Sequence, residues 1–590
     1  MKSSREKAKL RLRRAELARR NPPSFLARRA VLGLMLGAAF LSVVGSAFYR
    51  QVVETAFLKN EGEKRFLRTR EIAAPRGMVI DRNGEPLAIS TAVSTIWADP
   101  QVLAEQPAAL PDLAVALELP LAELRTRVDS YVENKRRFIY LRRRVEPHIA
   151  RSVEDLVDNA GLQGVGIDTE YRRFYPGGEM FGHVVGFTNI DDRGQEGIEL
   201  LYDSQLAAKP GARRVILDGR GRVVEEVEQV RPPQHGTDLV LSLDRRLQFL
   251  AYRELKRAVQ EHKAASGTAA LLDVETGEVL ALVNQPSYNP NKPRGEPAEQ
   301  RRNRALTDVF EPGSTVKPFV VAAGLDAGVI HPHTPVNTSP GYMRVGSNRV
   351  RDYRNLGSLD VTSVITKSSN VGVVKIAQRM DRAVLWQLYD RLGFGRPTAA
   401  QFPGERTGYL SRFEGWSSFE HATQAFGYGL NVTTLQLAQA YAVLANDGVR
   451  RPVTLFKRDA VPEGERVFSA DTSRKVRAMM ETVVSATGTA RRAAVTGYRV
   501  AGKTGTAKKA TSRGYVAGKY QSVFAGLAPV SRPRFVMVVM IDEPGGKEYF
   551  GGIVAAPTFA KVMQAALRLY NVPPDDPAAT MLLAAARGRR

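Results

Sequence analysis

Cysteine is absent from the 590 residues of this sequence, and tryptophan and histidine are scarce, with three and seven residues respectively. The lack of cysteine excludes disulfide bonds, thiolate metal sites and a cysteine nucleophile, although it does not identify a cellular compartment. His331 and His333 lie close together in a proline-containing loop, but two such residues are too few to predict a metal site. We expect neither a metal nor a cofactor.

Acidic residues are too few to balance the basic ones, since 61 aspartates and glutamates face 85 lysines and arginines, a formal net charge of +24 at pH 7. A basic surface raises nucleic acid as a candidate partner. The sequence has no zinc-ligand spacing, recognition motif or basic repeat interleaved with aromatic residues, so we expect no nucleic acid. An anionic membrane surface and an anionic substrate are the favoured partners, and a solvated basic surface is the simpler alternative.

Long hydrophobic runs are scarce too, and the N-terminal one, Ala30–Tyr49, has no charged residue over 20 positions. As a helix it would be about 30 Å long, the thickness of a bilayer's hydrocarbon core. Residues 1–29 hold eleven lysines and arginines against two glutamates. The positive-inside rule therefore predicts a cytoplasmic tail at 1–29 and a transmembrane anchor at 30–49, with everything from residue 50 outside. A cleavable signal peptide, ending near Gly45-Ser46-Ala47, is the rival interpretation.

Three short strings carry chemistry: Ser314-Thr315-Val316-Lys317, Ser368-Ser369-Asn370 and Lys503-Thr504-Gly505-Thr506. Each is weak evidence alone, because Ser4-Arg5-Glu6-Lys7 in the basic tail fits the first pattern by chance. Ser314, however, follows a turn and precedes the apolar run Phe319–Leu325, so it is predicted to open a buried helix. The free N–H groups of a helix N-terminus can stabilise an oxyanion beside a nucleophile.

The three strings predict complementary roles around a serine nucleophile. Lys317 lies one turn after Ser314, so its amine can take the hydroxyl proton if burial or a nearby cation keeps it neutral. Ser368 could relay a proton and Asn370 could hold a substrate amide. The string from Lys503 has the glycine-punctuated pattern of a strand, in which Gly505 leaves room for a passing backbone. A non-catalytic alternative, such as a capped helix, can explain each string alone. It explains all three strings in this order much less well.

The order of elements predicts an α+β fold. A hairpin is expected at Ser266–Val283, and later strands at Val500–Lys508, Tyr520–Ala528 and Phe535–Asp542. Helices are expected at Arg245–Val259, capped by Asp244, and from about Ala556 to Tyr570. Strands at both ends with helices between them predict a mostly antiparallel sheet flanked by helices.

The three strings resemble the S-x-x-K, S-x-N and K-T-G motifs of the penicillin-binding proteins and serine β-lactamases. Residues 307–318 are similar in particular to the division-specific class B members, and the similarity spans roughly residues 30–572. Further segments resemble the N-terminal signatures of the class B penicillin-binding proteins: Pro75–Gly84, Arg173–Pro176, Gly182–Thr188 and Gly194–Glu199.

The resemblance implies a penicillin-binding transpeptidase fold with a helical lobe, carried on an elongated pedestal of the dimerisation type. We place the pedestal at residues 50–240 and the transpeptidase domain at 241–572, followed by a mobile tail at 573–590. The implied location is the bacterial inner membrane, in one pass with the N-terminus inside, at the division site. The implied partners are stem peptides, β-lactams as covalent inhibitors, and division proteins including a septal glycan polymerase.

The resemblance further implies a serine-type D-Ala-D-Ala transpeptidase that crosslinks septal stem peptides through an acyl-enzyme. An elongation-type transpeptidase, a β-lactamase and a non-catalytic scaffold or β-lactam sensor are the alternatives. Aromatic residues are also expected to line the substrate groove, although they could instead simply pack in the core. The implied catalytic residues are Ser314, Lys317, Ser368, Asn370 and Lys503, and the implied substrate-binding residues are Thr504, Gly505, Thr506, Tyr428, Tyr549 and Phe550.

Overall fold

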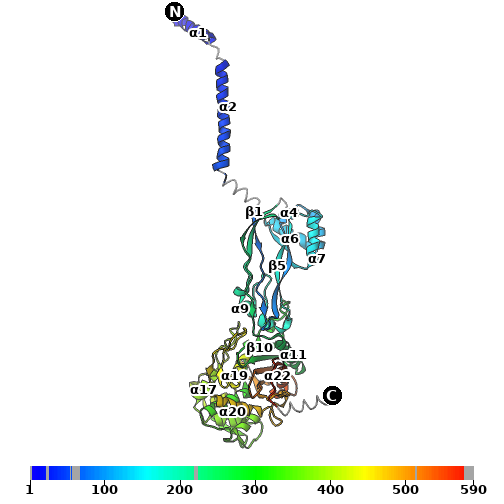
Figure 1. The fold of residues 1–590 in the computed structure, drawn as a ribbon, viewed down its shortest axis with the longest axis vertical. Helices are drawn as coiled ribbons and strands as arrows, with labels where there is room; N and C mark the ends of the chain where they lie inside the picture. Colours follow the sequence, from blue (N-terminus) through cyan, green and yellow to red (C-terminus); the bar gives the residue numbers. More distant parts are fainter. Residues whose placement is uncertain are drawn as a thin grey trace.

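The computed structural model describes residues 3–20, 25–53, 55, 67–217, 223–511 and 514–576. The chain is elongated, with helices α1 (Ser3–Arg20) and α2 (Phe25–Phe48) at one end, a narrow strand-rich region next, and a broad lobe at the other end (Figure 1). We call the narrow region the pedestal and the broad part, from residue 241, the C-terminal lobe.

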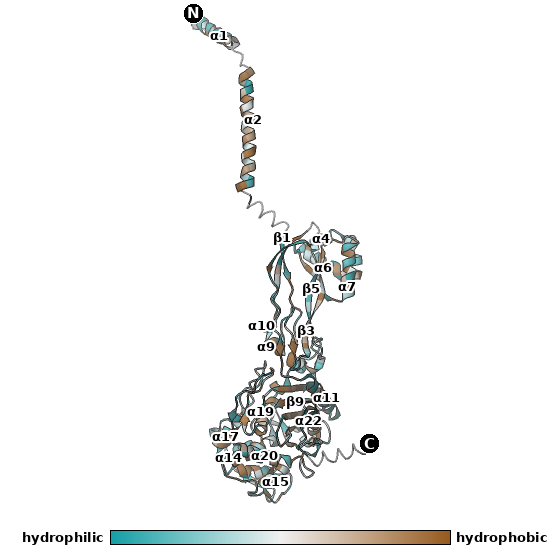
Figure 2. Cartoon of the chain, in the orientation of Figure 1, coloured by the Kyte–Doolittle hydropathy of each residue, from teal (hydrophilic) through white to brown (hydrophobic). Residues whose placement is uncertain are grey.

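Helix α2 continues through a π-helical turn at Tyr49–Val53, and Phe25–Val53 is the one helix in the described part of the chain that is long and apolar enough to cross a membrane. None of its residues is buried in the protein, and hydrophobic colour covers most of its length (Figure 2). The predicted anchor lies inside this helix. The helix starts earlier than the anchor because Arg28 and Arg29 end the apolar run without breaking helical geometry.

The pedestal is built on two long antiparallel strands, β3 (Pro86–Ala98) and β5 (Val165–Phe174), which pair from Ile89–Phe174 to Ala98–Val165. A second sheet joins β1 (Leu67–Ile72), β6 (Gly211–Leu217) and β7 (Val223–Arg231). A small hydrophobic core, separate from that of the C-terminal lobe, is formed by β3, β4 (Ile139–Val145), α4 (Pro100–Ala104), α5 (Leu110–Ala116), α6 (Leu121–Glu133) and α7 (Pro147–Asp158).

A buried ion cluster lies where the pedestal approaches the C-terminal lobe. Glu199 of helix α9 (Gly197–Leu201) accepts from Arg76 Nε and Arg173 Nε, both at 2.7 Å, and Arg76 also reaches Asp203 at 2.7 Å. Removing one member would leave an uncompensated buried charge, which typically costs about 3–5 kcal/mol. The cluster therefore ties segments far apart in sequence into one rigid base.

The C-terminal lobe contains a five-stranded antiparallel sheet in the order β10-β9-β19-β18-β17. Every residue of β9 (Ser266–Asp273), β10 (Val279–Gln285) and β19 (Phe535–Asp542) is buried, because helices cover both faces. Helices α11 (Arg245–Glu261) and α22 (Ala556–Leu569) pack together on the sheet, as do α19 (Thr434–Ala445) and α20 (Ala470–Glu481). The α+β prediction is confirmed.

The edge strand β17 (Ala501–Thr511), paired with β18 (Gly514–Ala528), faces the helical part of the lobe. Both predicted strands are present. β17 runs three residues beyond its predicted end at Lys508, and β18 begins six residues before its predicted start at Tyr520. The helices of this part are α13 (Arg304–Thr307), α14 (Lys317–Asp326), α15 (Val361–Lys367), α16 (Asn370–Ala377), α17 (Arg382–Leu392) and α18 (Ser418–Gln424).

The predicted C-terminal tail begins as an ordered segment. Asp575 accepts hydrogen bonds from the backbone of Arg499 at 2.7 Å and of Ser531 at 3.0 Å, and the Asp576 N–H donates to Gly497 O at 3.2 Å. The first four residues of the predicted tail are therefore held against the lobe. Residues 577–590 lie outside the described residues, so mobility there stays a prediction.

Candidate active site

The three sequence strings meet at one cavity of about 590 Å³ in the C-terminal lobe. Six of the predicted site residues line it together: Ser314, Ser368, Asn370, Thr504, Thr506 and Phe550. The wall is completed by residues that the sequence did not single out: Asp352, Tyr353, Lys367, Thr489, Gly551, Gly552 and Ile553.

Ser314 lies in the 3-10 turn Gly313–Val316, which runs directly into α14. The turn needs Gly313 at φ 53°, a left-handed conformation that strains other residues. Helix α14 is buried from Lys317 to Gly324, which fixes the turn against the core. The predicted buried helix is present, but a tighter turn takes the place of its first α-helical turn.

Lys317 is fully buried, and its amine points at the second string. Its Nζ donates to Ser368 O at 2.6 Å, to Asn370 Oδ1 at 2.7 Å and to Ser368 Oγ at 3.2 Å. Burial lowers the pKa of Lys317 well below its usual value, and the charge of Lys503 lowers it further against the opposing effect of Asp352. Among the described residues, the Ser314 hydroxyl has no hydrogen bond, so the predicted contact from Lys317 is not made in this state.

Ser368 holds its hydroxyl between two amines. It ends α15 in the left-handed conformation, with φ 58° and ψ 38°. Its Oγ lies 2.9 Å from Lys503 Nζ and 3.2 Å from Lys317 Nζ. Burial lowers the pKa of Lys503 to about 7. A hydroxyl in this position can pass a proton between the nucleophile side and a leaving group.

Asp352 is a site residue that sequence reasoning missed. Its Oδ2 accepts from Ser369 Oγ at 2.6 Å, and its Oδ1 accepts from the backbone of Asn370 at 2.5 Å and of Val371 at 3.1 Å. Ser369 in turn accepts from the backbone of Gly372 at 2.8 Å and so caps α16. This carboxylate thereby fixes the loop that presents Ser368 and Asn370 to Lys317.

Replacing Asp352 with alanine is expected to lower the free energy of unfolding by about 2–4 kcal/mol and to slow acylation by a β-lactam roughly ten- to a hundredfold. The reason is that three buried donors lose their acceptor and the second string loses its anchor. Asp381→Ala is the matched control, because Asp381 caps α17 in the same lobe without lining the cavity. It should cost about 1 kcal/mol and leave acylation unchanged. Equal acylation rates in the two variants would show that Asp352 does not position the second string.

The third string forms part of the edge strand β17. Gly505 allows a close approach, since a Cβ there would lie 2.8 Å from Pro312 O and 2.9 Å from Thr315 Cγ2. Thr504 Oγ1 lies 3.0 Å from Thr489 Oγ1, and Thr506 Oγ1 accepts from the backbone of Gly551 at 3.2 Å. The strand is thus clamped against the turn that carries Ser314.

Of the three predicted aromatic residues, one lines the cavity and two do not. Phe550 lines the cavity and is 55% exposed, whereas Tyr549 is stacked between Phe550 and Tyr520, with ring centroids 4.6 Å and 4.0 Å apart. Tyr428 packs against Tyr515 at 5.8 Å and, like Tyr549, does not line the cavity as described. The exposed ring of Tyr353 does line it, and nothing in its sequence context signals this position.

The lysine pair predicts a pH dependence that can be measured. With Lys317 as the predicted base, the acylation rate should rise as its amine loses a proton. With Lys503 as the predicted carboxylate anchor, a carboxylate-bearing penicillin should bind best while Lys503 is protonated. Because the pKa of Lys503 is about 7, the rate should fall as the pH rises through that value. Rates measured from about pH 5 to about pH 9 should show this alkaline limb. In the Lys503→Arg variant the side chain stays positively charged, so the fall in rate should move to higher pH. If it does not move, another group must cause the fall.

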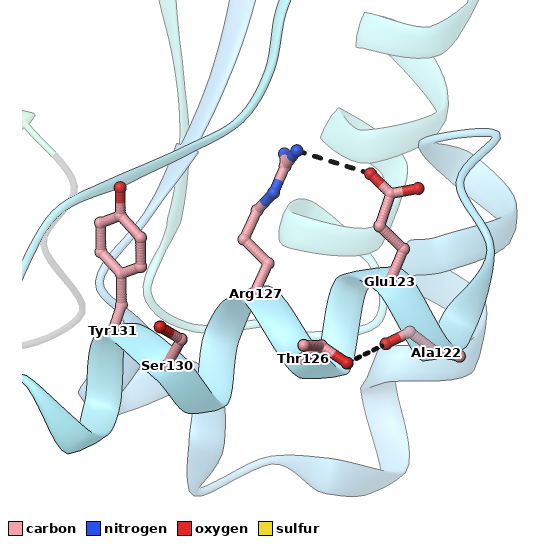
Figure 3. Close-up of a pocket in the computed structure, with 6 residues that line it drawn as sticks. All are labelled: Ala122, Glu123, Thr126, Arg127, Ser130 and Tyr131. Carbon is pink, nitrogen blue, oxygen red and sulfur yellow. Dashed lines mark hydrogen bonds and ion pairs between the residues drawn. The ribbon is translucent and has the colours of Figure 1, made fainter.

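A depression of about 520 Å³ on the pedestal helix α6 offers a contrast (Figure 3). It is formed by one helix face, on which Glu123 and Arg127 pair with each other at 3.5 Å. Thr126 donates to the Ala122 carbonyl, so its hydroxyl is also satisfied within the helix. No nucleophile with a buried base converges there among the described residues, and the cavity beside Ser314 remains the candidate active site.

A half-buried serine on a helix-entry turn, two buried lysines sharing a second serine, and an edge strand beside them define an enzyme of the serine acyl-transfer class. A family model described as penicillin binding protein transpeptidase domain matches residues 267–564, and one described as penicillin-binding protein dimerisation domain matches residues 71–241. The chain belongs to the penicillin-binding protein transpeptidases.

Curated relatives and solved structures agree with this assignment. The chain is 44% identical over 514 residues to the peptidoglycan D,D-transpeptidase FtsI of Escherichia coli K12, covering 86% of each chain. It is 38% identical to FtsI of Buchnera aphidicola over 515 residues, covering 86% of this chain and 89% of the relative. The transpeptidase domain of penicillin-binding protein 3 from Burkholderia pseudomallei is 45% identical, with a TM-score of 0.53 over 57% of this chain and 98% of that one.

A peptidoglycan synthetase structure from Bifidobacterium adolescentis shares the fold over a longer stretch. It matches with a TM-score of 0.68 and 24% identity, over 87% of this chain and 98% of that one. Its coverage reaches beyond the transpeptidase domain, so the pedestal and the C-terminal lobe are found together in it.

Proposed function

We propose that this protein is a septal peptidoglycan D,D-transpeptidase that uses Ser314 as its nucleophile. The observation that carries the proposal is the convergence of the three strings on one cavity, with the buried amines of Lys317 and Lys503 both contacting Ser368. The E. coli relative is named as a peptidoglycan D,D-transpeptidase, which supports the same chemistry here.

In the acylation step, Ser314 Oγ attacks the carbonyl of the terminal D-Ala-D-Ala bond, and its proton moves to the neutral amine of Lys317. The C–N bond then breaks, an ester to Ser314 forms, and the departing D-alanine takes a proton through Ser368. Backbone N–H groups of Ser314 and Thr506 stabilise the oxyanion, a contribution of about 3 kcal/mol for each such donor. Asn370 orients the donor amide, while Lys503, Thr504 and Thr506 hold the carboxylate end.

In the second step, an amine from a neighbouring stem peptide attacks the ester carbonyl. The C–O bond breaks, an amide crosslink forms, and Ser314 recovers its proton as the attacking amine loses one. A β-lactam takes the donor's place in the first step and stays bound as an ester. Helix α2 anchors the protein to the inner membrane with its N-terminus inside, and division proteins including a septal glycan polymerase are the proposed neighbours.

The test is a reaction of the full-length protein with a donor peptide ending in D-Ala-D-Ala and an amine acceptor. We expect equal amounts of D-alanine and crosslinked peptide, and complete inhibition by one equivalent of a penicillin. Turnover of the penicillin would instead indicate a β-lactamase. A stable penicillin adduct with no crosslinking would favour a β-lactam sensor or scaffold.

The division role has its own test in cells. A fluorescent fusion of the Ser314→Ala variant should gather at midcell, because the anchor and pedestal are intact, yet fail to support septation. Distribution along the side wall would favour the elongation-type alternative, and diffuse membrane fluorescence would count against docking that is separable from catalysis.

A further inference from the structure

A second cavity, of about 330 Å³, lies between the pedestal and the C-terminal lobe. We call it the junction pocket. The pedestal contributes Glu196 and His183 of α8 (Gly182–Val185), and the lobe contributes Phe402, Arg406 and the end of α12 (Ala298–Arg301). It shares no lining residue with the cavity beside Ser314, so whatever binds there is not part of the acyl-transfer site.

Positive charge dominates the junction pocket, because Arg301, Arg302 and Arg406 line it against the single carboxylate of Glu196. Only Arg302 is neutralised locally, by Asp308 at 2.6 Å. In the described part of the chain, the Nε of Arg301 is buried without a hydrogen-bond partner, and its guanidinium lies over the Phe187 ring at 5.8 Å. The side chain of Arg406 is exposed to solvent and forms no ion pair there. Arg301 therefore has an unused buried donor at the pocket, and the solvated guanidinium of Arg406 at the rim is available to an anion.

The other two ionisable groups that line the pocket are His183 and Glu196, and of these only Glu196 opposes the positive charge. His183 Nε2 lies 2.7 Å from Gln300 O, and since a carbonyl can only accept, Nε2 carries the ring proton. Burial lowers the pKa of His183 to about 4, so the ring is neutral at pH 7. Burial also raises the pKa of Glu196, an effect that Arg301 opposes. The arginines thus set the charge of the pocket.

The size of the pocket brings these cations close together. A volume of 330 Å³ is that of a sphere about 9 Å across, similar to the Debye length of about 8 Å at physiological ionic strength. Guanidinium groups around one cavity of this size repel one another, and an anion bound between them lowers the repulsion. Their fork of N–H donors matches carboxylate and phosphate oxygens in pairs.

We propose that the junction pocket binds a small oxyanion ligand that carries at least two carboxylate or phosphate groups. Arg301 and Arg406 hold its charged groups, and the ring of Phe402 forms the apolar wall. The ligand lies between pedestal and lobe, so its binding stabilises the junction against bending. This site is independent of the chemistry at Ser314 and stands whether or not the protein crosslinks peptides.

The test is calorimetric titration of the full-length protein in detergent micelles with pyrophosphate and, separately, with citrate, at constant ionic strength. We expect a Kd of about 1 mM or tighter for at least one probe. Arg301→Ala and Arg406→Ala should each weaken it about tenfold or more, whereas Glu196→Gln should tighten it by removing the opposing charge. Arg412→Ala, an exposed arginine of the same lobe paired with Glu414, is the control and should bind as the wild type does.

The two probes separate the ligand chemistries. Binding of pyrophosphate alone indicates a phosphate-bearing ligand, binding of citrate alone indicates a carboxylate-bearing one, and binding of both indicates selection by charge. Absence of binding by either probe, or equal weakening in the Arg412→Ala control, would overturn the proposal. Labelling of each variant by a fluorescent penicillin shows that the fold is intact, and the opposite response of Glu196→Gln cannot come from unfolding.

Discussion

The Ser314→Ala variant is expected to form no covalent adduct with a fluorescent penicillin, while the wild-type protein forms one adduct for each chain. Alanine removes the hydroxyl oxygen that is proposed to become the ester oxygen. Other hydroxyls line the cavity, but none of them lies on a turn at a helix entry with a buried lysine one turn away. The measurement is intact mass after labelling, followed by peptide mapping of the modified residue.

Ser4→Ala provides a matched control for this result. Ser4 begins the chance match Ser4-Arg5-Glu6-Lys7, which lies in the exposed helix α1 with no core beneath it. Its removal should leave labelling unchanged, since neither a cavity nor a buried amine accompanies the pattern there. An adduct that persists in Ser314→Ala and maps to another residue would disprove the assignment of the nucleophile.

Replacing Lys317 with methionine is expected to slow acylation about a thousandfold, the middle of the range for a general base. Methionine fills similar volume but cannot take the Ser314 proton or donate to Ser368 and Asn370. Because the lysine is fully buried, its removal also relieves a desolvation cost, so the unfolding temperature should be unchanged or higher. Acylation rates and thermal unfolding of the same preparation measure both effects.

Lys375→Met is the control for that experiment. Lys375 lies on α16, next to the second string, but its ammonium donates to Asn337 O at 2.6 Å and it does not line the cavity. The acylation rate should therefore stay within a factor of about two. If Lys317→Met acylates as fast as this control, the base must be another group, and Lys503 across Ser368 would be the next to test.

The sequence was sufficient to predict the sheet of the C-terminal lobe and its framing helices. Continuous apolar runs and turn residues marked β9, β10 and β19, and the Asp244 cap marked the start of α11. These features are local, so their signals lie within a few neighbouring residues. The boundaries at residues 240 and 572 depend on where contacts cross between segments, and they stay predictions.

The contacts inside the site could not be predicted in the same way. Asp352 precedes Ser369 by 17 positions, after the hairpin of β12 (Tyr342–Val345) and β13 (Asn348–Arg351), and no spacing rule connects them. Likewise, the i to i+3 spacing placed Lys317 beside Ser314, but the amine is satisfied by three acceptors on the far wall. Burial of a charged amine demands such acceptors, and only the folded chain determines which ones are in reach.

The left-handed backbone of Ser368 has a consequence for the balance between stability and activity. A serine held at φ 58° and ψ 38° carries about 1 kcal/mol of conformational cost that glycine would not. Ser368→Gly should therefore raise the unfolding temperature above that of Ser368→Ala, although both variants lose the hydroxyl that connects the two amines. Serine at this position therefore lowers the stability of the fold relative to glycine. Such a cost is expected where a side chain is needed for its chemistry.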